Sequence, residues 1–189
     1  FDHEKIKGPF CMQLKALANT GILLPEICLG TMTFGEQNTQ SDAFEQLEYA
    51  LDQGLFFWDT AEMYPVPPKP ETQGATETIL GNWIAQRGKR DQLFIASKIA
   101  GPSQGGSHIR DGQTRFNAAD IGSAIDGSLK RLQTDYIDLY QLHWPQRPTN
   151  FFGKLGYGNT EAQNTDEITA LEETLTALSH EIKNGRIRY

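Results

Sequence analysis

The stretch FFWDTAEMY at residues 56–64 decides how the rest of the chain is interpreted. It continues an apolar run from Leu55 to Trp58 that reads as a buried strand, and this run stops abruptly at Asp59. Tyr64 follows five residues later. A carboxylate at the end of a buried strand is costly unless a cation or a donor pairs with it. We therefore expect another segment of the chain to supply a cation for Asp59.

Apolar runs with the length of strands recur along the chain on both sides of this stretch. One amphipathic helical pattern separates each run from the next, and this alternation predicts an α/β fold with a parallel sheet. The expected strands are residues 27–29, 55–58, 93–97 and 136–142, with a fifth beginning at residue 186.

Four helices are expected between these strands, each with an apolar stripe that should face the sheet. The first covers residues 41–53, the second is capped by Thr76 and ended by Gly88, the third is capped by Asn117, and the fourth covers residues 166–183. In the fourth helix the expected inward stripe is Ile168, Leu171, Leu175, Leu178 and Ile182.

Two folds share this alternation, the doubly wound sheet and the (β/α)₈ barrel. No G-x-G-x-x-G follows the first expected strand, which argues against a dinucleotide-binding doubly wound sheet. A complete barrel needs roughly 250 residues, and this chain has 189. We therefore predict a (β/α)₈ TIM barrel truncated to about its first four βα units plus the start of strand five, with a β-hairpin at residues 14–24. Residues 1–11 are expected to be a leader or flanking segment, and residues 12–189 the N-terminal half of the barrel.

Composition and charge narrow the function classes. The net charge is −7 and the basic residues are scattered, which argues against a nucleic-acid or anionic-membrane surface. No apolar run approaches the ~18 residues of a membrane span. The two cysteines, Cys11 and Cys28, lack zinc-binding or disulfide-framework spacing, and no signal peptide precedes them, so a cytoplasmic location is expected.

Polar side chains end three consecutive expected strands: Asp59, Lys98 and His143. In a barrel, the C-terminal ends of the strands converge on one mouth, and reactive groups come from different strands. A single polar residue at a strand end is more often an ordinary residue reaching solvent. Three of them, with Tyr64 nearby, favour an active site.

These four residue types could form one proton-transfer device. An isolated phenol holds its proton up to about pH 10, and an ammonium ~4 Å away, at an effective dielectric of ~20, favours the phenolate by roughly 4 kcal/mol. Lys98 could supply that field to Tyr64, and Asp59 would keep Lys98 charged. His143 could donate a hydrogen bond to a substrate carbonyl. Together they suit protonation of an oxyanion formed by hydride attack on a carbonyl.

Several segments resemble the aldo-keto reductase family. The motifs are D-T-A-E-M-Y at residues 59–64, I-A-S-K at 95–98 and D-Y-I-D-L-Y-Q-L-H-W at 135–144. The long loops MYPVPPKPETQGATE and HWPQRPTNFFGKLGYG look like those of the bacterial Tas-like subgroup. The resemblance runs from about residue 12 to residue 189.

This resemblance implies a (β/α)₈ barrel that reduces aldehydes or ketones with NADP(H), without a metal. It implies that Tyr64 is the general acid, that Lys98 and Asp59 ease its proton release, and that His143 orients the carbonyl. It also implies a substrate pocket formed by Tyr64, His143 and Trp144, and a cofactor site formed by Gly30, Thr31, Met32 and Asp59. On sequence alone, Thr31 and Met32 fit ordinary barrel packing equally well.

The chain departs from the family in its length. By resemblance, the residues that stack on the nicotinamide and bind the phosphates come mainly from strands five to eight. We therefore expect the 189-residue chain to bind NADPH weakly or not at all. Because an open half barrel leaves edge strands unpaired, we also expect the fragment to self-associate through them.

Other functions remain open at this point. A metal-dependent barrel hydrolase could use Asp59 and His143, although the sequence has no H-x-H or H-E-x-x-H pair. A paired-carboxylate glycosidase would need a second acid at a strand end. A regulatory or redox-sensing module could hold the cofactor on the same barrel without significant turnover.

Overall fold

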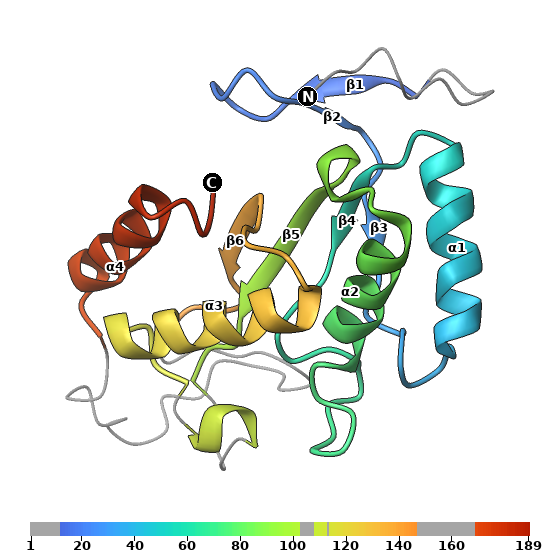
Figure 1. Ribbon diagram of the computed structural model, residues 1–189. Coiled ribbons are helices and arrows are strands. Elements are labelled where there is room, and N and C mark those ends of the chain that lie inside the picture. Colours follow the sequence, from blue (N-terminus) through green and yellow to red (C-terminus); the bar gives the residue numbers. More distant parts are fainter. Residues whose placement is uncertain (1–11, 103–107, 113, 147–168) are drawn as a thin grey trace, which may run out of the picture.

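The computed structural model describes residues 12–102, 108–112, 114–146 and 169–189. Its centre is a parallel sheet in the order β3-β4-β5-β6. The strands are β3 (Leu29–Gly30), β4 (Phe57–Asp59), β5 (Phe94–Ile99) and β6 (Leu139–Leu142), and an antiparallel hairpin of β1 (Leu14–Ala16) and β2 (Leu23–Pro25) precedes them. The hairpin lies beyond the end at which the sheet strands begin (Figure 1).

The helices follow the strands in alternation and lie in chain order along one side of the sheet (Figure 1). They are α1 (Gln40–Asp52), α2 (Ala75–Arg87), α3 (Ala118–Leu132) and α4 (Leu171–Lys183), with short 3₁₀ segments η2 (Arg90–Gln92) and η3 (Ile109–Gly112). Each α-helix contacts the next. None of the helices in the described ranges has the length and apolar character to cross a membrane.

A fifth chain segment lies beside β6, as the sequence predicts. Ile137 and Ile187 form a parallel bridge. The Ile137 amide donates to the carbonyl of Arg186, and the Tyr140 amide donates to that of Tyr189. Residues 186–189 therefore extend the parallel sheet by one segment beside β6.

The core lies between the sheet and the helices. Trp58 on β4 and Trp83 on α2 are both fully buried, with ring centroids 5.0 Å apart in an edge-to-face arrangement. The expected inward faces of the second and third helices are confirmed, because their apolar residues are buried or packed on the core: Ile79, Leu80, Trp83, Ile84, Ile121, Ala124, Ile125, Leu129 and Leu132.

Helix starts follow the capping chemistry at two of three positions. Thr39 forms a capping box with Asp42, so α1 begins one residue before the expected start. Asn117 caps α3 by accepting from the Asp120 amide, as predicted. The prediction that Thr76 caps α2 is wrong. Gly74 occupies that position with φ of 77°, and the buried Thr76 hydroxyl instead donates to the carbonyl of Phe34 at 2.7 Å.

The predicted inward stripe of the fourth helix is also wrong within the described residues. Leu171 is 63% exposed, Leu175 53% and Ile182 45%, while Leu178 is partly buried. The buried residues of α4 are Thr174, Ala177 and Glu181. Polar contacts explain this orientation, because the Thr174 hydroxyl donates to the Phe116 carbonyl at 3.0 Å and Glu181 pairs with Arg186 at 3.2 Å. Residue 168 and the expected start of this helix lie outside the described residues.

Candidate active site

The C-terminal ends of three neighbouring strands bring the predicted site residues together. Lys98 Nζ lies 2.7 Å from Asp59 Oδ2, 2.8 Å from the Thr60 carbonyl oxygen and 3.4 Å from the Tyr64 hydroxyl. The ammonium also lies 4.8 Å from the centroid of the Tyr64 ring. The cation that the sequence requires for Asp59 is therefore Lys98, and the phenol shares it.

Strand register explains why these side chains meet. Asp59 on β4 aligns with Ala96 on β5, and side chains two residues apart on a strand point to the same face. Lys98 is thus on the face of Asp59, one step closer to the C-terminal end. The expected strand at residues 93–97 ends too early, because β5 continues through Lys98 to Ile99.

The segment after β4 places Tyr64 beside the C-terminal end of β5. The Thr60 amide donates to the Ala96 carbonyl, and the Glu62 amide donates to the Lys98 carbonyl at 3.1 Å. The carbonyl of Tyr64 accepts from the Gly74 amide at the start of α2. Tyr64 is buried, so both its backbone and its ring are fixed beside Lys98.

Asp59 has further partners that orient its carboxylate and its backbone. Gln141 on β6 lies 3.4 Å from Asp59 Oδ1. The Thr31 hydroxyl donates to the Asp59 carbonyl at 2.8 Å. Gln141 aligns with Lys98 in the register between β5 and β6, so it reaches Asp59 from the strand on the far side of Lys98. The sequence did not identify Gln141.

The residues predicted to contact a cofactor lie beside this cluster. Gly30 aligns with Asp59 across β3 and β4, and there is open space where a Cβ of Gly30 would be. Thr31 is fully buried, and its hydroxyl already serves Asp59. Met32 is half exposed, and its carbonyl accepts from the Val66 amide. Gly30 and the Met32 side chain are therefore accessible beside the cluster, whereas Thr31 supports the site from within.

His143 follows β6 and faces the tyrosine. The ring centroids of His143 and Tyr64 lie 5.6 Å apart in an edge-to-face arrangement, and Trp144 lies 5.1 Å from His143. Burial lowers the pKa of His143 to about 4. The positive charge of Lys98 also lowers this pKa, whereas the negative charge of Asp59 raises it. The ring is therefore neutral at pH 7 and keeps one N–H donor. Trp144 donates its indole N–H to the Pro102 carbonyl at 2.9 Å.

Cys28 is a neighbour of the cluster that the sequence treated only as an unpaired cysteine. Burial and the charge of Asp59 raise the pKa of Cys28 to about 12, although Lys98 opposes them. The thiol is thus protonated and a poor nucleophile at neutral pH. Side chains two residues apart on a strand point to the same face. The spacing between Cys28 and Gly30 could therefore have placed Cys28 near the cluster.

A metal centre has no support from the described residues. Within them, no three His, Cys, Asp or Glu side chains gather as candidate ligands. The cluster instead joins a carboxylate, an ammonium, a phenol and a neutral imidazole. This set can hold a carbonyl oxygen, deliver a proton to it and stabilise the phenolate that is left.

Comparison with known proteins assigns the family. Residues 26–189 match the Aldo/keto reductase family. The chain belongs to the aldo/keto reductase family. Protein tas of Escherichia coli (strain K12) is 52% identical over 179 residues, which are 94% of this chain and 51% of that protein. The predicted likeness to the Tas subgroup of aldo/keto reductases is thus confirmed.

More distant relatives are consistent with this family. An uncharacterized oxidoreductase of Bacillus subtilis (strain 168), YrpG, is 37% identical over 183 residues, which are 94% of this chain and 48% of that protein. The crystal structure of a thermostable aldo-keto reductase, Tm1743, in complex with the inhibitor epalrestat matches with a TM-score of 0.68 and 31% identity, over 94% of this chain and 52% of that one. The parallel sheet therefore belongs to a (β/α)₈ barrel type of α/β fold. The chain spans about half the length of the curated relatives it matches.

Proposed function

We propose that this chain supplies the proton-donating half of an NADPH-dependent reductase that converts aldehydes or ketones to alcohols. The observation that carries the proposal is the position of Lys98 Nζ, 2.7 Å from Asp59 and 3.4 Å from the Tyr64 hydroxyl. In this proposal the described residues form the first half of the barrel, and the enzyme is cytoplasmic, in keeping with its few cysteines.

Tyr64 is the proton donor in this scheme. NADPH, when bound, supplies the hydride that reaches the carbonyl carbon. The electron pair of the C=O π bond moves to the carbonyl oxygen, which takes the proton of the Tyr64 hydroxyl to give the alcohol. The phenolate that remains is stabilised by Lys98 and regains a proton from water. A positioned general acid of this kind typically contributes ~10²–10⁴-fold to the rate.

The other three residues hold this donor and the substrate in place. Asp59 fixes the ammonium of Lys98 by the contact at 2.7 Å. The neutral His143 donates to the carbonyl oxygen and holds it towards Tyr64. Trp144, beside His143, forms one wall of the substrate pocket. Gly30 and Met32 would lie against the nicotinamide.

The test is the oxidation of NADPH by the full-length protein in the presence of a panel of aromatic aldehydes, quinones and small ketones, followed at 340 nm. We expect turnover with at least one carbonyl and slower turnover with NADH. Tight NADPH binding without oxidation on any carbonyl would contradict a reductase and favour a regulatory module. Failure to bind NADPH at all would contradict both.

The 189-residue chain by itself is expected to behave differently. Within the described residues the sheet has β3 at one edge and residues 186–189 at the other, and unpaired strand edges invite pairing with another chain. We propose that the chain self-associates and binds NADPH only weakly. Sedimentation velocity should show species larger than a monomer, and fluorescence titration should show no micromolar affinity. A cooperatively folding monomer that binds NADPH tightly would contradict both expectations.

A further inference from the structure

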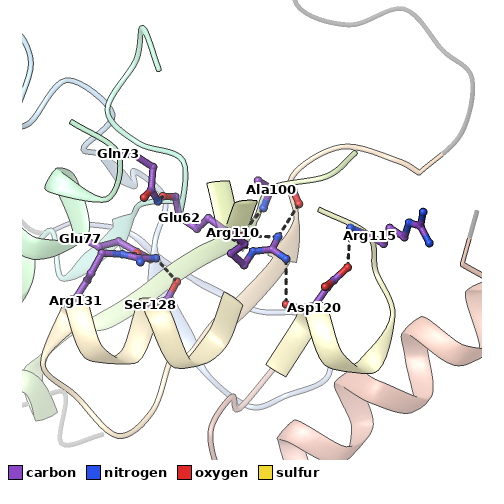
Figure 2. Close-up of polar contacts among 9 residues, drawn as sticks. All are labelled: Glu62, Gln73, Glu77, Ala100, Arg110, Arg115, Asp120, Ser128 and Arg131. Atoms are coloured by element: carbon purple, nitrogen blue, oxygen red, sulfur yellow. Dashed lines mark hydrogen bonds and ion pairs between the residues drawn. The ribbon is translucent and has the colours of Figure 1, made fainter. Parts of the chain in front are cut away.

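Glu62 is a buried acid within the segment that connects β4 to Tyr64, and it has no part in the proposed proton transfer. Its carboxylate is 2% exposed. Oε2 accepts from the Ala100 amide at 2.9 Å, and Oε1 accepts from Arg110 Nε at 2.7 Å. Figure 2 shows Glu62 and Arg110 facing each other beside Ala100.

The backbone of Glu62 is also held on both sides. Its amide donates to the carbonyl of Lys98 at 3.1 Å, and its carbonyl accepts from Gln73 Nε2 at 2.7 Å. Glu62 thus connects the segment that contains Tyr64 to the backbone of Lys98. It also ties this segment to the turn that leads into α2.

Arg110 extends these contacts to the region between β5 and α3. Its guanidinium reaches the Ala100 carbonyl at 3.4 Å and the carbonyl of Asp120, in the first turn of α3, at 3.3 Å. Arg110 and Asp111 both adopt left-handed backbone conformations, with φ of 48° and 53°. Such conformations are unfavourable for residues other than glycine, so contacts of the Arg110 side chain compensate for a strained η3.

The energetics favour a positional role for this pair. Burial raises the pKa of Glu62, and the Arg110 guanidinium and the Ala100 amide act against that shift. A buried ion pair often adds little stability over apolar packing of the same shape, because both charges lose water. What such a pair does provide is directional constraint, since a fork of N–H donors meets a carboxylate in a defined geometry.

We propose that Glu62 is a positioning residue that sets the Tyr64 hydroxyl at its distance from Lys98 and couples that distance to η3 through Arg110. The inference rests on the proposed function, in which Tyr64 is the proton donor. The contact it controls is 3.4 Å long, at the outer limit of a hydrogen bond. A small outward movement of the segment would therefore break the contact.

Glu62→Gln is the most informative substitution. Glutamine keeps the size of the side chain but has one oxygen and one NH₂ group, so either the Ala100 amide or Arg110 must face a donor. We expect kcat of the full-length protein to fall by about 10- to 100-fold, in line with a misplacement of about 1 Å at a catalytic group. The Kd for NADPH should stay within about threefold, because Glu62 holds the proton donor rather than the cofactor.

Glu77→Gln is the matched control. Glu77 on α2 is fully buried and holds a similar pair, with contacts of 2.7 Å to Arg131 and 2.6 Å to the Ser97 hydroxyl. In Figure 2 this pair lies over α3, beside Glu62 and farther from Arg110. The control should lower the melting temperature at least as much as Glu62→Gln but leave kcat within about twofold.

A second readout does not depend on turnover. The protein labelled with ζ-¹³C-tyrosine gives a resonance for Tyr64 that is assigned by its loss in Tyr64→Phe. We expect this resonance to shift at pH 7 in Glu62→Gln and to stay in place in Glu77→Gln. Should Glu62→Gln fail to fold, Arg110→Lys replaces it, because a compact ammonium cannot contact Glu62, Ala100 and Asp120 together.

The outcomes separate the two claims. A lower kcat and a shifted Tyr64 resonance in Glu62→Gln, with neither in Glu77→Gln, support the inference. An unchanged kcat and resonance in Glu62→Gln, or equal changes in both variants, overturn it. A wild-type protein that reduces no carbonyl overturns the proposed function, and the resonance then still decides whether Glu62 positions Tyr64.

Discussion

A carboxylate meets a cation and a tyrosine at both ends of the sheet, and it is fully buried at only one of them. At the N-terminal end, Asp138 is fully buried and accepts from Arg90 at 2.7 Å, from Arg188 at 3.0 Å and from the Ile95 amide at 2.9 Å. Both guanidinium groups lie 3.9 Å from the centroid of the Tyr136 ring, so the ring contacts both cations.

The C-terminal end uses the same residue classes differently. There the cation is Lys98, and the hydroxyl of Tyr64 rather than only its ring contacts the cation. Arginine stays charged and binds in a rigid fork, whereas lysine is a compact point charge beside a phenol that can release a proton. The pairing at Asp138 therefore holds the chain together, while the pairing at Asp59 places an exchangeable proton beside a cation.

Asp138→Ala should have the largest effect on stability. The change leaves Arg90 and Arg188 without the buried carboxylate that joins them, and breaking a buried ion pair costs about 3–5 kcal/mol. Urea unfolding should show a loss of that size in the free energy of unfolding, with kcat of the remaining folded protein unchanged. Asp126→Asn is the control, since Asp126 pairs with Arg186 but is 72% exposed, and it should cost less than about 1 kcal/mol.

Lys98→Met should lower the rate of reduction strongly and the stability only slightly. In the proposed mechanism, loss of the ammonium removes the group that stabilises the Tyr64 phenolate, so kcat of the full-length protein should fall by about 10²–10³-fold. Asp59 keeps Gln141 and solvent as partners, and the free energy of unfolding should fall by only about 1–2 kcal/mol. Stopped-flow reduction and urea unfolding of the same sample test both halves. A large loss of stability with little loss of rate would reverse the comparison.

His143 should give the smallest effect and a pH signature. Its pKa lies at about 4 in the folded chain, below the ordinary 6.5, so the unfolded chain binds a proton between these values while the folded chain does not. The stability that the neutral ring contributes is present above about pH 6.5 and is lost as the pH falls towards 4. Because the ring is partly exposed, the loss should be about 1–2 kcal/mol.

Urea unfolding of wild type and His143→Gln at pH 7 and pH 4.5 isolates this contribution. The wild type should lose more stability than the variant between these two pH values. Identical pH dependence in the two proteins would show that His143 is not held neutral by its surroundings.

Sequence reasoning succeeds where geometry follows from strand order. Asp59, Lys98 and His143 could be placed at one mouth because each follows or ends a parallel strand, and such ends converge. The pairing of Asp59 with Lys98 follows from the cost of an unpaired carboxylate. Neither step requires knowledge of side-chain packing.

Prediction from the sequence fails where polar residues face inward. Thr174 and Glu181 are buried on α4 through contacts to Phe116 and Arg186, so the apolar stripe identifies the wrong face of that helix. Thr76 is drawn into the core in the same way by the Phe34 carbonyl. Hydrophobic periodicity cannot detect hydrogen bonds between distant segments.

The pair of Glu62 and Arg110 is out of reach for the same reason. The two residues are 48 positions apart, and Arg110 lies in an irregular segment with left-handed backbone. The one available signal is an acid between Asp59 and Tyr64, where a loop side chain would normally reach solvent.

The most direct test compares Tyr64→Phe with Tyr136→Phe in single-turnover reduction of a carbonyl by NADPH bound to the full-length protein. Each variant loses one hydroxyl from a ring beside a cation, at opposite ends of the sheet. We predict that Tyr64→Phe slows the reaction by at least about 100-fold with unchanged NADPH affinity, and that Tyr136→Phe changes it by less than about twofold. Turnover that survives in Tyr64→Phe would contradict the assignment of Tyr64 as the proton donor.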